Sequence, residues 1–369
     1  MNRERIALIS LFPLGNMGGG EFLTLNTLKA VAATGAQCRL YAAQREIPPL
    51  QPLNARLTTE FLQVFDSESR QRPASLAFKD VLAACADFDV VWVHQYLSND
   101  LVFDLINTVA SDQTLLLTNE GHEPLLGLFN QIYQWSPNHW CVEISNFSRD
   151  RAAGYTRQTI GPGAGAWNNQ LRNGEQLTRP FRHRACCIGR ILPHKGVEIS
   201  IEGLPNNFEL NVVGNPDLDA DYSKLLRQTA GGKHIQFLGP LAEAAKTRVL
   251  EESDVLIASS CVSLYNGKKI EQAELLGLVL IEAVAAGVLP VASDTSPFPE
   301  VMANLGLGEY VYPQRDSGAL NRILQRYEAL DDQSRTELRR RSQALLRQHY
   351  LFDDYWHRVR AAIGMRGPE

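Results

Sequence analysis

The chain has 369 residues, which is enough for two ordinary domains. Its composition, with 44% hydrophobic and 21% charged residues, is that of a globular protein. The net charge of −5 argues against a nucleic-acid partner, because such proteins carry a basic stripe. No apolar run is long enough to cross a bilayer, so we expect no transmembrane segment.

Basic residues and cysteines add two further expectations. The dense basic run Arg339–Arg341 lies in a polar helical stretch and is predicted to be a solvated helix face. The six cysteines are scattered and form no Cys-x-x-Cys pair, so we expect buried, reduced thiols in a cytoplasmic protein. Zinc-ligand spacing is absent from the sequence, and no metal site is predicted.

Short apolar runs alternate with amphipathic stretches through the first 160 residues. The predicted strands are 6–11, 37–42, 90–94, 114–118 and 139–143. The predicted helices are 21–34, 101–111 and 124–133. This β–α alternation is typical of a parallel sheet that is covered on both faces by helices.

A glycine-rich break at 161–165 opens an aperiodic stretch that extends to about residue 184. The strands predicted beyond it are 184–188, 208–213, 235–238, 255–259 and 289–292. The helices predicted between them are 197–204, 222–230, 242–252 and 278–286. We therefore predict two Rossmann-like, doubly wound α/β domains, residues 1–163 and 164–350, with ligands bound in the cleft at their strand ends.

The segment from Glu274 to Gly287 is the strongest functional signal. Gly277 lets the chain turn into an apolar helix, and Gly287 ends that helix. The buried N-terminus of such a helix offers free N–H groups and partial positive charge, which suit a diphosphate. Eight residues of continuous helix would rotate Glu274 and Glu282 by about 80° relative to each other. Glu274 must therefore lie in a loop if both carboxylates face one ligand.

This segment resembles a known family. The pattern Glu-x7-Glu followed by Ala-x-Ala-x-Gly-x-x-Pro-Val is similar to the donor motif of family 4 glycosyltransferases. The resemblance implies the GT-B fold, with two Rossmann-like domains facing a central cleft and a C-terminal helix, here 351–369, that crosses back to the first domain. It also implies that Glu274 holds hydroxyls of the donor sugar, that Glu282 holds ribose hydroxyls, and that Leu276, Gly277 and Leu278 line the donor.

A second match is Gly189-Arg190-x4-Lys195-Gly196, which follows a predicted strand. Members of the resembled family carry Gly-Arg-x4-Lys-Gly here, and the resemblance implies that Arg190 and Lys195 neutralise the donor diphosphate beside Gly189. Such cations are needed because negative charge accumulates on the departing diphosphate, and removing one stabiliser typically costs on the order of 10² to 10³ in rate.

The first domain carries weaker matches. Gly18, Gly19 and Gly20 follow the first strand and permit close backbone approach to a ligand. In the resembled family this loop borders the diphosphate and the acceptor, whereas the dinucleotide pattern Gly-x-Gly-x-x-Gly is not satisfied, which disfavours a dehydrogenase. Family members also present a histidine after a strand of this domain. We assign that role to His122, with His94 as the rival.

Two other segments leave alternatives open. The Asp-x-Asp patterns at 87–89 and 217–219 are read as solvated turns, and neither a metal nor a cofactor is expected. The segment 262–273 is longer than in many members of the resembled family. It predicts either a plain surface loop or a rim of the donor or acceptor site, where Lys268 and Lys269 would meet phosphate.

The resemblance implies a retaining hexosyltransferase that moves a sugar from a nucleotide-diphosphate sugar to an acceptor hydroxyl by front-face attack. The acceptor is a carbohydrate, a lipid-linked molecule or a small molecule, bound by the first domain. That domain has 12 Lys and Arg against 16 Asp and Glu, which weakens the case for peripheral membrane contact. Two alternatives remain: a nucleotide-sugar 2-epimerase, which needs no acceptor, and a non-catalytic nucleotide-sugar-binding subunit.

Overall fold

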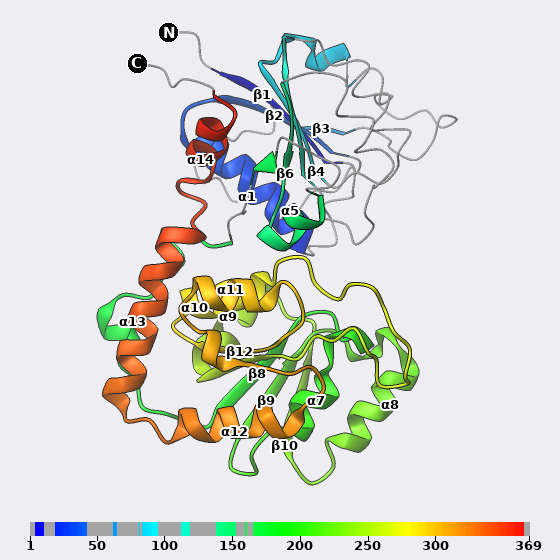
Figure 1. Ribbon diagram of the computed structural model, residues 1–369, viewed down its shortest axis with the longest axis vertical. Coiled ribbons are helices and arrows are strands. Elements are labelled where there is room, and N and C mark those ends of the chain that lie inside the picture. The colour runs from blue at the N-terminus through cyan, green and yellow to red at the C-terminus, as the bar shows by residue number, and fades with distance from the viewer. Residues whose placement is uncertain are drawn as a thin grey trace. The chain divides into compact units, whose positions relative to one another are not determined.

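The chain folds into two compact units in the computed structural model (Figure 1). Unit 1 comprises Met1–Ala164 and Phe352–Glu369, and unit 2 comprises Gly165–Leu351. The structure describes residues 4–10, 19–42, 62–64, 81, 83–94, 112–118, 138–152, 159–160 and 165–364. The helices expected at 101–111 and 124–133 lie outside these residues.

Unit 1 is built on a parallel sheet, in which seven described strands have the order β3-β2-β1-β4-β5-β6-β7. The strands are β1 Arg5–Ser10, β2 Gln37–Ala42, β3 Leu62–Val64, β4 Val90–His94, β5 Thr114–Thr118, β6 His139–Val142 and β7 Thr159–Ile160. The described helices are α1 Gly19–Ala33, the 3-10 helix Cys85–Asp87, α5 Asn146–Ala152 and α14 Tyr355–Ala362. The central strand β4 is buried along its whole length, which explains its continuous apolar sequence.

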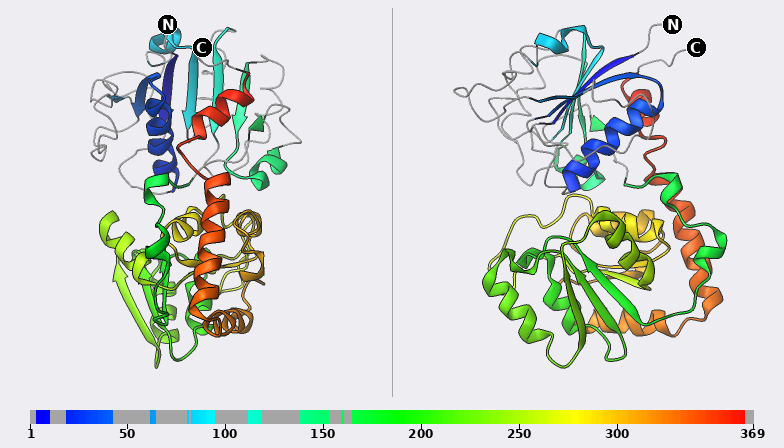
Figure 2. Two further views of the ribbon diagram at one scale, coloured as in Figure 1. Left: turned by 90° about the vertical axis from the view of Figure 1, so that its left-hand side faces the viewer. Right: turned by 180° about the vertical axis from the view of Figure 1, so that it is seen from behind.

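The C-terminal helix α14 completes the core of unit 1. Trp356 is fully buried, and its ring centroid lies 5.8 Å from that of Trp92 on β4. Phe352 packs edge-on against Phe22 of α1, with the two ring centroids 6.2 Å apart. Residues far apart in the sequence therefore share one apolar cluster, and the predicted return of the C-terminal helix to the first domain is confirmed (Figure 2).

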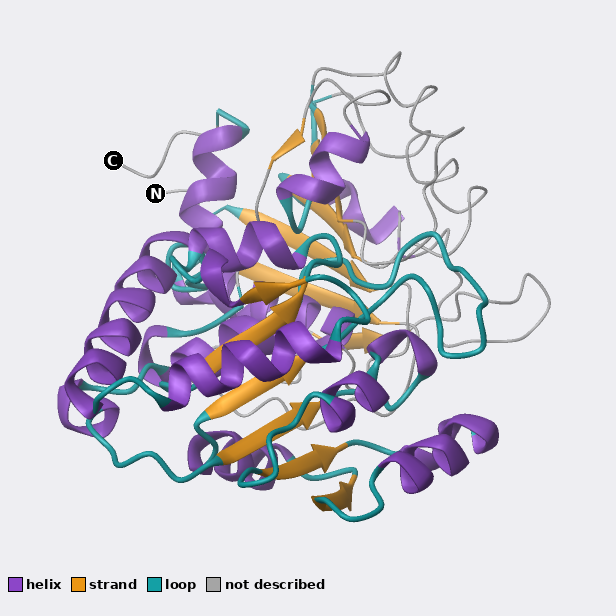
Figure 3. Cartoon of the chain, turned by 60° about the horizontal axis from the view of Figure 1, so that its bottom comes forward, coloured by secondary structure: helices purple, strands orange, loops and turns teal. Residues whose placement is uncertain are grey.

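Unit 2 contains a second parallel sheet with the order β10-β9-β8-β11-β12-β13. Its strands are β8 Arg184–Ile188, β9 Glu209–Val213, β10 His234–Gly239, β11 Val255–Ala258, β12 Leu289–Ser293 and β13 Val311–Tyr312. Its α-helices are α6 Gly174–Leu177, α7 Val197–Glu202, α8 Ala220–Thr229, α9 Glu243–Glu252, α10 Leu278–Ala285, α11 Phe298–Asn304, α12 Ser317–Glu328 and α13 Asp332–His349. Figure 3 draws the helices in purple and the strands in orange.

The predicted fold class is confirmed, because each unit is a doubly wound parallel α/β sheet. Every strand expected from the sequence is present, with ends that differ by one residue at most. The sequence reading missed β3, β7 and β13. Each of these strands has only two or three residues, which is too short to show a hydrophobic period.

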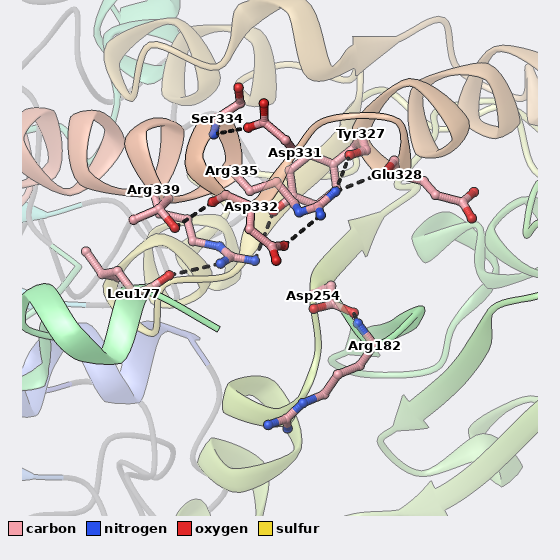
Figure 4. A network of polar contacts seen from close by, with 11 residues as sticks. Leu177, Arg182, Asp254, Tyr327, Glu328, Asp331, Asp332, Ser334, Arg335 and Arg339 are labelled. Atoms are coloured by element: carbon pink, nitrogen blue, oxygen red, sulfur yellow. Dashed lines mark hydrogen bonds and ion pairs between the residues drawn. The ribbon is translucent and has the colours of Figure 1, made fainter. Parts of the chain in front are cut away.

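The basic run in α13 corrects one expectation. Arg340 and Arg341 are exposed, but Arg339 is buried with 4% of its surface accessible. Its guanidinium donates to the carbonyl oxygen of Leu177 at 3.0 Å and to the hydroxyl of Tyr327 at 3.2 Å (Figure 4). The prediction of a wholly solvated face was wrong, because successive helix residues point in directions about 100° apart, so three neighbouring arginines do not share one face. Hydrogen bonds offset the cost of burying that charge.

All six cysteines are buried free thiols, as expected. Burial raises the pKa of Cys38 and of Cys187 to about 12, so both stay protonated near neutral pH.

Among the helices of the described residues, none combines the length and the apolar character that crossing a membrane requires.

Candidate functional site

The strand order of unit 2 reverses between β8 and β11, and ligands of open α/β sheets bind at the carboxyl ends of the strands at such a point. The loop after β8 carries Lys195, and the segment after β11 leads to Glu274. The two segments touch, because the backbone N–H of Cys261 donates to the carbonyl oxygen of His194 at 2.8 Å. The fold thus brings together two motifs that are about 80 residues apart in the sequence.

Lys195 and Glu274 form the centre of this region. The Nζ atom of Lys195 lies 2.5 Å from Oε1 of Glu274, and the hydroxyl of Ser260 donates to the same oxygen at 2.5 Å. Burial raises the pKa of Glu274, but the charge of Lys195 and these hydrogen bonds outweigh it and hold the pKa below its usual range. Glu274 is therefore an ionised acceptor at neutral pH.

Gly277 turns the chain from the Glu274 loop into α10, as the sequence predicts. Its φ of +91° favours glycine, and a Cβ atom there would lie 2.6 Å from the ring of Phe298. Leu276 is buried with 4% exposure, and Leu278 begins the helix. The first turn of α10 therefore presents backbone N–H groups close to the loop that holds Glu274.

Glu282 lies on α10 and pairs with a residue that the sequence reading missed. Nζ of Lys246 on α9 is 3.5 Å from Oε2 of Glu282 and 2.9 Å from Oε1 of Glu243. Burial raises the pKa of Glu282, Lys246 lowers it and Glu243 raises it, with a net rise. Lys246 gave no signal, because a lysine three residues after a glutamate is the ordinary pattern of an exposed helix.

Gly189 and Arg190 follow β8 directly, at the same end of the strand as Lys195. The N–H of Gly189 donates to the carbonyl oxygen of Val213 at 3.0 Å, which fixes the start of the loop. Arg190 is exposed, and within the described part of the chain its guanidinium makes no ion pair or hydrogen bond. Arg190 therefore lies at the same end of β8 as Lys195 but is not part of the Lys195–Glu274 ion pair.

The site residues expected in the first domain are only partly described. Gly19 and Gly20 begin α1, whereas Gly18 and His122 lie outside the described residues. His94 is the last residue of β4, is fully buried, and has its ring centroid 5.2 Å from that of Trp92. The rival histidine is therefore part of the packed sheet, and the assignment of His122 stays a prediction.

The two Asp-x-Asp patterns serve local structure. Asp89 accepts a hydrogen bond from the backbone N–H of Arg5 at 2.7 Å, before β4 begins. Asp219 caps α8 by accepting from the N–H of Tyr222 at 2.9 Å. Over the stretches that the structure describes, no three His, Cys, Asp or Glu side chains gather in a metal-binding arrangement.

Gly196 offers a direct test of how closely the two loops fit. Its φ is +60°, and a Cβ atom would lie 2.1 Å from the carbonyl oxygen of Ser259. Gly196→Ala is expected to destabilise the protein by more than the ~1–2 kcal/mol that a left-handed conformation costs a residue with a side chain. Gly232→Ala is the matched control, because Gly232 has φ +79° and open space around its Cβ position. Denaturant unfolding should show a clearly larger loss for Gly196→Ala; equal losses would mean that the loops separate freely.

Residues 176–344 match the family model described as glycosyl transferases group 1. The phosphatidyl-myo-inositol mannosyltransferase of Mycobacterium leprae is 35% identical over 136 residues, which cover 35% of this chain and 32% of the relative. The chain spans about a third of the length of the curated relatives it matches.

Solved structures resemble the whole chain. The Anabaena protein HepE, determined in complex with UDP and glucose, gives a TM-score of 0.70 at 15% identity and covers 99% of this chain and 100% of its own. A glycosyltransferase of Rickettsia africae gives a TM-score of 0.74 at 14% identity and covers 99% of both chains. At such identities the likeness shows the fold.

Two doubly wound sheets, the returning C-terminal helix and these structural likenesses define the GT-B class of folds. The family match within unit 2, together with the curated relatives, identifies the class more narrowly. The matched stretch, less than half of the chain, is similar to the group 1 glycosyltransferases, and the motifs around Lys195 and Glu274 lie within it.

Proposed function

We propose that the chain is a retaining glycosyltransferase, which moves a hexosyl group from a nucleotide-diphosphate sugar to an acceptor hydroxyl. The observation that carries the proposal is the Lys195–Glu274–Ser260 cluster at the switch point of unit 2. The relatives support it, since one is named a mannosyltransferase and HepE was solved with UDP and glucose.

Each residue of the site has a proposed task. The ionised carboxylate of Glu274 accepts hydrogen bonds from hydroxyls of the donor sugar, and Glu282 accepts them from the ribose. Lys195 and the exposed Arg190 neutralise the diphosphate, which the backbone N–H groups at the start of α10 also bind. These cations supply the positive charge that the leaving group needs, so we propose a reaction without a divalent metal or another cofactor. Chelation by EDTA should then leave the rate unchanged.

The proposed reaction is a front-face displacement. The acceptor oxygen bonds to the anomeric carbon on the face from which the diphosphate departs, while the bond from that carbon to the diphosphate oxygen breaks. The acceptor proton passes to an oxygen of the leaving phosphate, so no side chain acts as a nucleophile. We propose that unit 1 binds the acceptor and that His122 is its catalytic residue. The six buried thiols are consistent with a cytoplasmic location.

Thermal unfolding in the presence of UDP-glucose, GDP-mannose and ADP-glucose tests the donor proposal. One nucleotide class should raise the melting temperature, since a ligand at 100 times its Kd stabilises the folded state by ~2.7 kcal/mol. No stabilisation by any of them would contradict a nucleotide-sugar site. Consumption of the bound donor without acceptor would favour the epimerase, and binding without any turnover would favour the non-catalytic subunit.

The raised pKa of Glu282 predicts a pH dependence of nucleotide binding. The pKa of Glu282 in the folded state lies above its unfolded value, so protonation of Glu282 adds to the free energy of unfolding at low pH. This added stability is lost as the pH rises through the folded-state pKa. Nucleotide affinity should fall as pH drops through the same pKa, since protonated Glu282 accepts ribose hydrogen bonds poorly. Titration calorimetry across pH measures the midpoint of that fall.

Two variants should move this midpoint in opposite directions. Lys246→Met removes the charge that lowers the pKa of Glu282, so the midpoint should shift to higher pH. Glu243→Gln removes a repelling carboxylate, so the midpoint should shift to lower pH. Shifts in the same direction, or none, would show that Glu282 does not control nucleotide affinity.

A further inference from the structure

A buried carboxylate lies next to the proposed donor site without belonging to it. Glu198, in the first turn of α7, has a side chain that is only 3% exposed. Its Oε2 accepts a hydrogen bond from the hydroxyl of Tyr222 at 2.5 Å, and its Oε1 lies 3.1 Å from Nη1 of Arg315. The side chain of Arg315 is 36% exposed, so the pair joins a buried carboxylate to a guanidinium that stays partly in solvent. An ion pair with such a solvated partner contributes little to stability, so its presence calls for another explanation.

Each partner of Glu198 also holds a segment of the donor site. The hydroxyl of Tyr222 accepts from the backbone N–H of Val197 at 2.8 Å, which fixes the start of α7 two residues after Lys195. Nη1 of Arg315 also donates to the carbonyl oxygen of Ser263 at 3.2 Å, in the segment that leads to Glu274. Glu198 thus joins the Lys195 side of the site to the Glu274 side.

The segment that Arg315 holds is a β-hairpin, residues 262–270, which appears as a yellow loop of unit 2 in Figure 1. The N–H of Leu264 donates to the carbonyl oxygen of Lys268 at 2.8 Å, and the N–H of Ile270 donates to that of Val262 at 2.9 Å. At its turn, Tyr265 stacks on Tyr222 with ring centroids 5.4 Å apart. Lys268 and Lys269 are exposed. The hairpin is therefore anchored on the body of the unit, and Glu274 follows four residues after it.

Arg315 keeps an unfavourable backbone to make these contacts. Its φ is +63°, a conformation that costs a residue other than glycine on the order of 1–3 kcal/mol and tends to occur at functional sites. Glycine or asparagine would adopt it more easily. The arginine side chain reaches both Glu198 and Ser263 from this position, and neither smaller residue does so.

We infer that Arg315 is a positioning residue for the donor sugar: through Glu198 and Ser263 it fixes the hairpin, and with it the carboxylate of Glu274 relative to Lys195. This inference rests on the proposed nucleotide-sugar site. Glu274 is proposed to bind the sugar and Lys195 the diphosphate. A displaced hairpin should therefore weaken binding of the sugar more than binding of the diphosphate. In addition, misplacement of reacting groups by about 1 Å can reduce a reaction rate by on the order of 10²-fold.

The test compares two ligands on one variant. Arg315→Asn keeps a residue that tolerates the backbone conformation but cannot reach Glu198. Titration calorimetry with UDP and UDP-glucose, or with GDP and GDP-mannose if that pair binds the wild type, gives both affinities without an acceptor. We expect Arg315→Asn to lose about tenfold or more in affinity for the nucleotide sugar, because a hydrogen bond from the sugar to Glu274 is weakened, and less than about threefold for the nucleoside diphosphate. Equal losses for both ligands, or no loss for either, would overturn the inference.

Two further variants separate positioning from stability. His183→Asn is the matched control, because His183 also has a positive φ, +58°, and pairs with Glu328 at 2.9 Å just before β8, at the opposite end of the strand. It should leave the ratio of the two affinities unchanged. Arg315→Asn combined with Glu198→Gln removes the unpaired buried charge and should recover thermal stability but not sugar affinity. Recovery of both would show that Arg315 acts on stability alone.

Failure of the proposed function gives a different result. If the wild-type protein binds neither UDP nor GDP and neither of their sugar conjugates, the donor site itself is wrong. If the wild type binds a pair and Arg315→Asn binds both members as the wild type does, the donor site stands and the positioning role is wrong.

Discussion

Replacing Glu274 by alanine is expected to reduce the rate of transfer by on the order of 10² to 10³, while the protein stays folded. The carboxylate is held ionised by Lys195 and Ser260, so its loss removes the charged acceptor from the proposed sugar site. Lys195→Ala should reduce the rate by a similar factor through the diphosphate. Initial rates with the donor found in the thermal screen, together with circular dichroism of each variant, provide the measurement.

The matched control for this pair is Glu337→Ala, which removes an exposed carboxylate from α13. Its rate should equal that of the wild type. Near-normal turnover in Glu274→Ala and in Lys195→Ala would mean that the ion pair is structural. If the alanine variants do not fold, Glu274→Gln takes their place, because glutamine keeps the shape of the side chain. This variant should lose most of the transfer rate.

Ending the chain at Leu351 is expected to unfold unit 1. This removes four side chains that are at most 1% exposed: Phe352, Tyr355, Trp356 and Val359. Burial of such a side chain contributes ~1.5–3 kcal/mol, so their sum is comparable to the total stability of an ordinary domain. It also removes the pair between Arg360 and Glu4, which lie 3.0 Å apart. Thermal unfolding followed by near-ultraviolet circular dichroism should lose the transition of unit 1.

A chain that ends at Gly364 keeps all of α14 and serves as the control for this truncation. It should unfold like the full chain. In the shorter chain, nucleotide should still shift the melting of unit 2, because all residues of the Lys195–Glu274 cluster belong to that unit. A chain ending at Leu351 with an unchanged near-ultraviolet spectrum would contradict the packing role of α14.

Local sequence signals were sufficient where the chemistry is local. Gly277 was expected to begin a helix, and the structure gives it a left-handed conformation directly before α10. The long, continuously apolar strands were recognised for the same reason, since their period is read within a few residues. The angle between positions eight apart on a helix required a loop at Glu274 only on the condition that Glu274 and Glu282 face one ligand, and Glu274 does lie in a loop before α10.

Contacts between distant segments were not predictable from the sequence. Glu198 and Arg315 are 117 residues apart, and neither position differs from an ordinary surface charge until the fold brings them together. Lys246 pairs with Glu282 across two helices for the same reason. Arg339 was expected to be exposed and is buried, because its direction depends on which face of α13 packs against Tyr327. Side-chain partners of this kind are decided by tertiary packing rather than by spacing.

The central claim is that the Lys195–Glu274 region of unit 2 binds a nucleotide-diphosphate sugar. A crystal structure of the protein with the nucleotide that most raises its melting temperature tests this claim most directly. We expect diphosphate oxygens within hydrogen-bond distance of Nζ of Lys195 and of the backbone N–H groups at the start of α10, with ribose hydroxyls on Glu282. A nucleotide bound elsewhere in the chain, with the Lys195–Glu274 pair untouched, would contradict it.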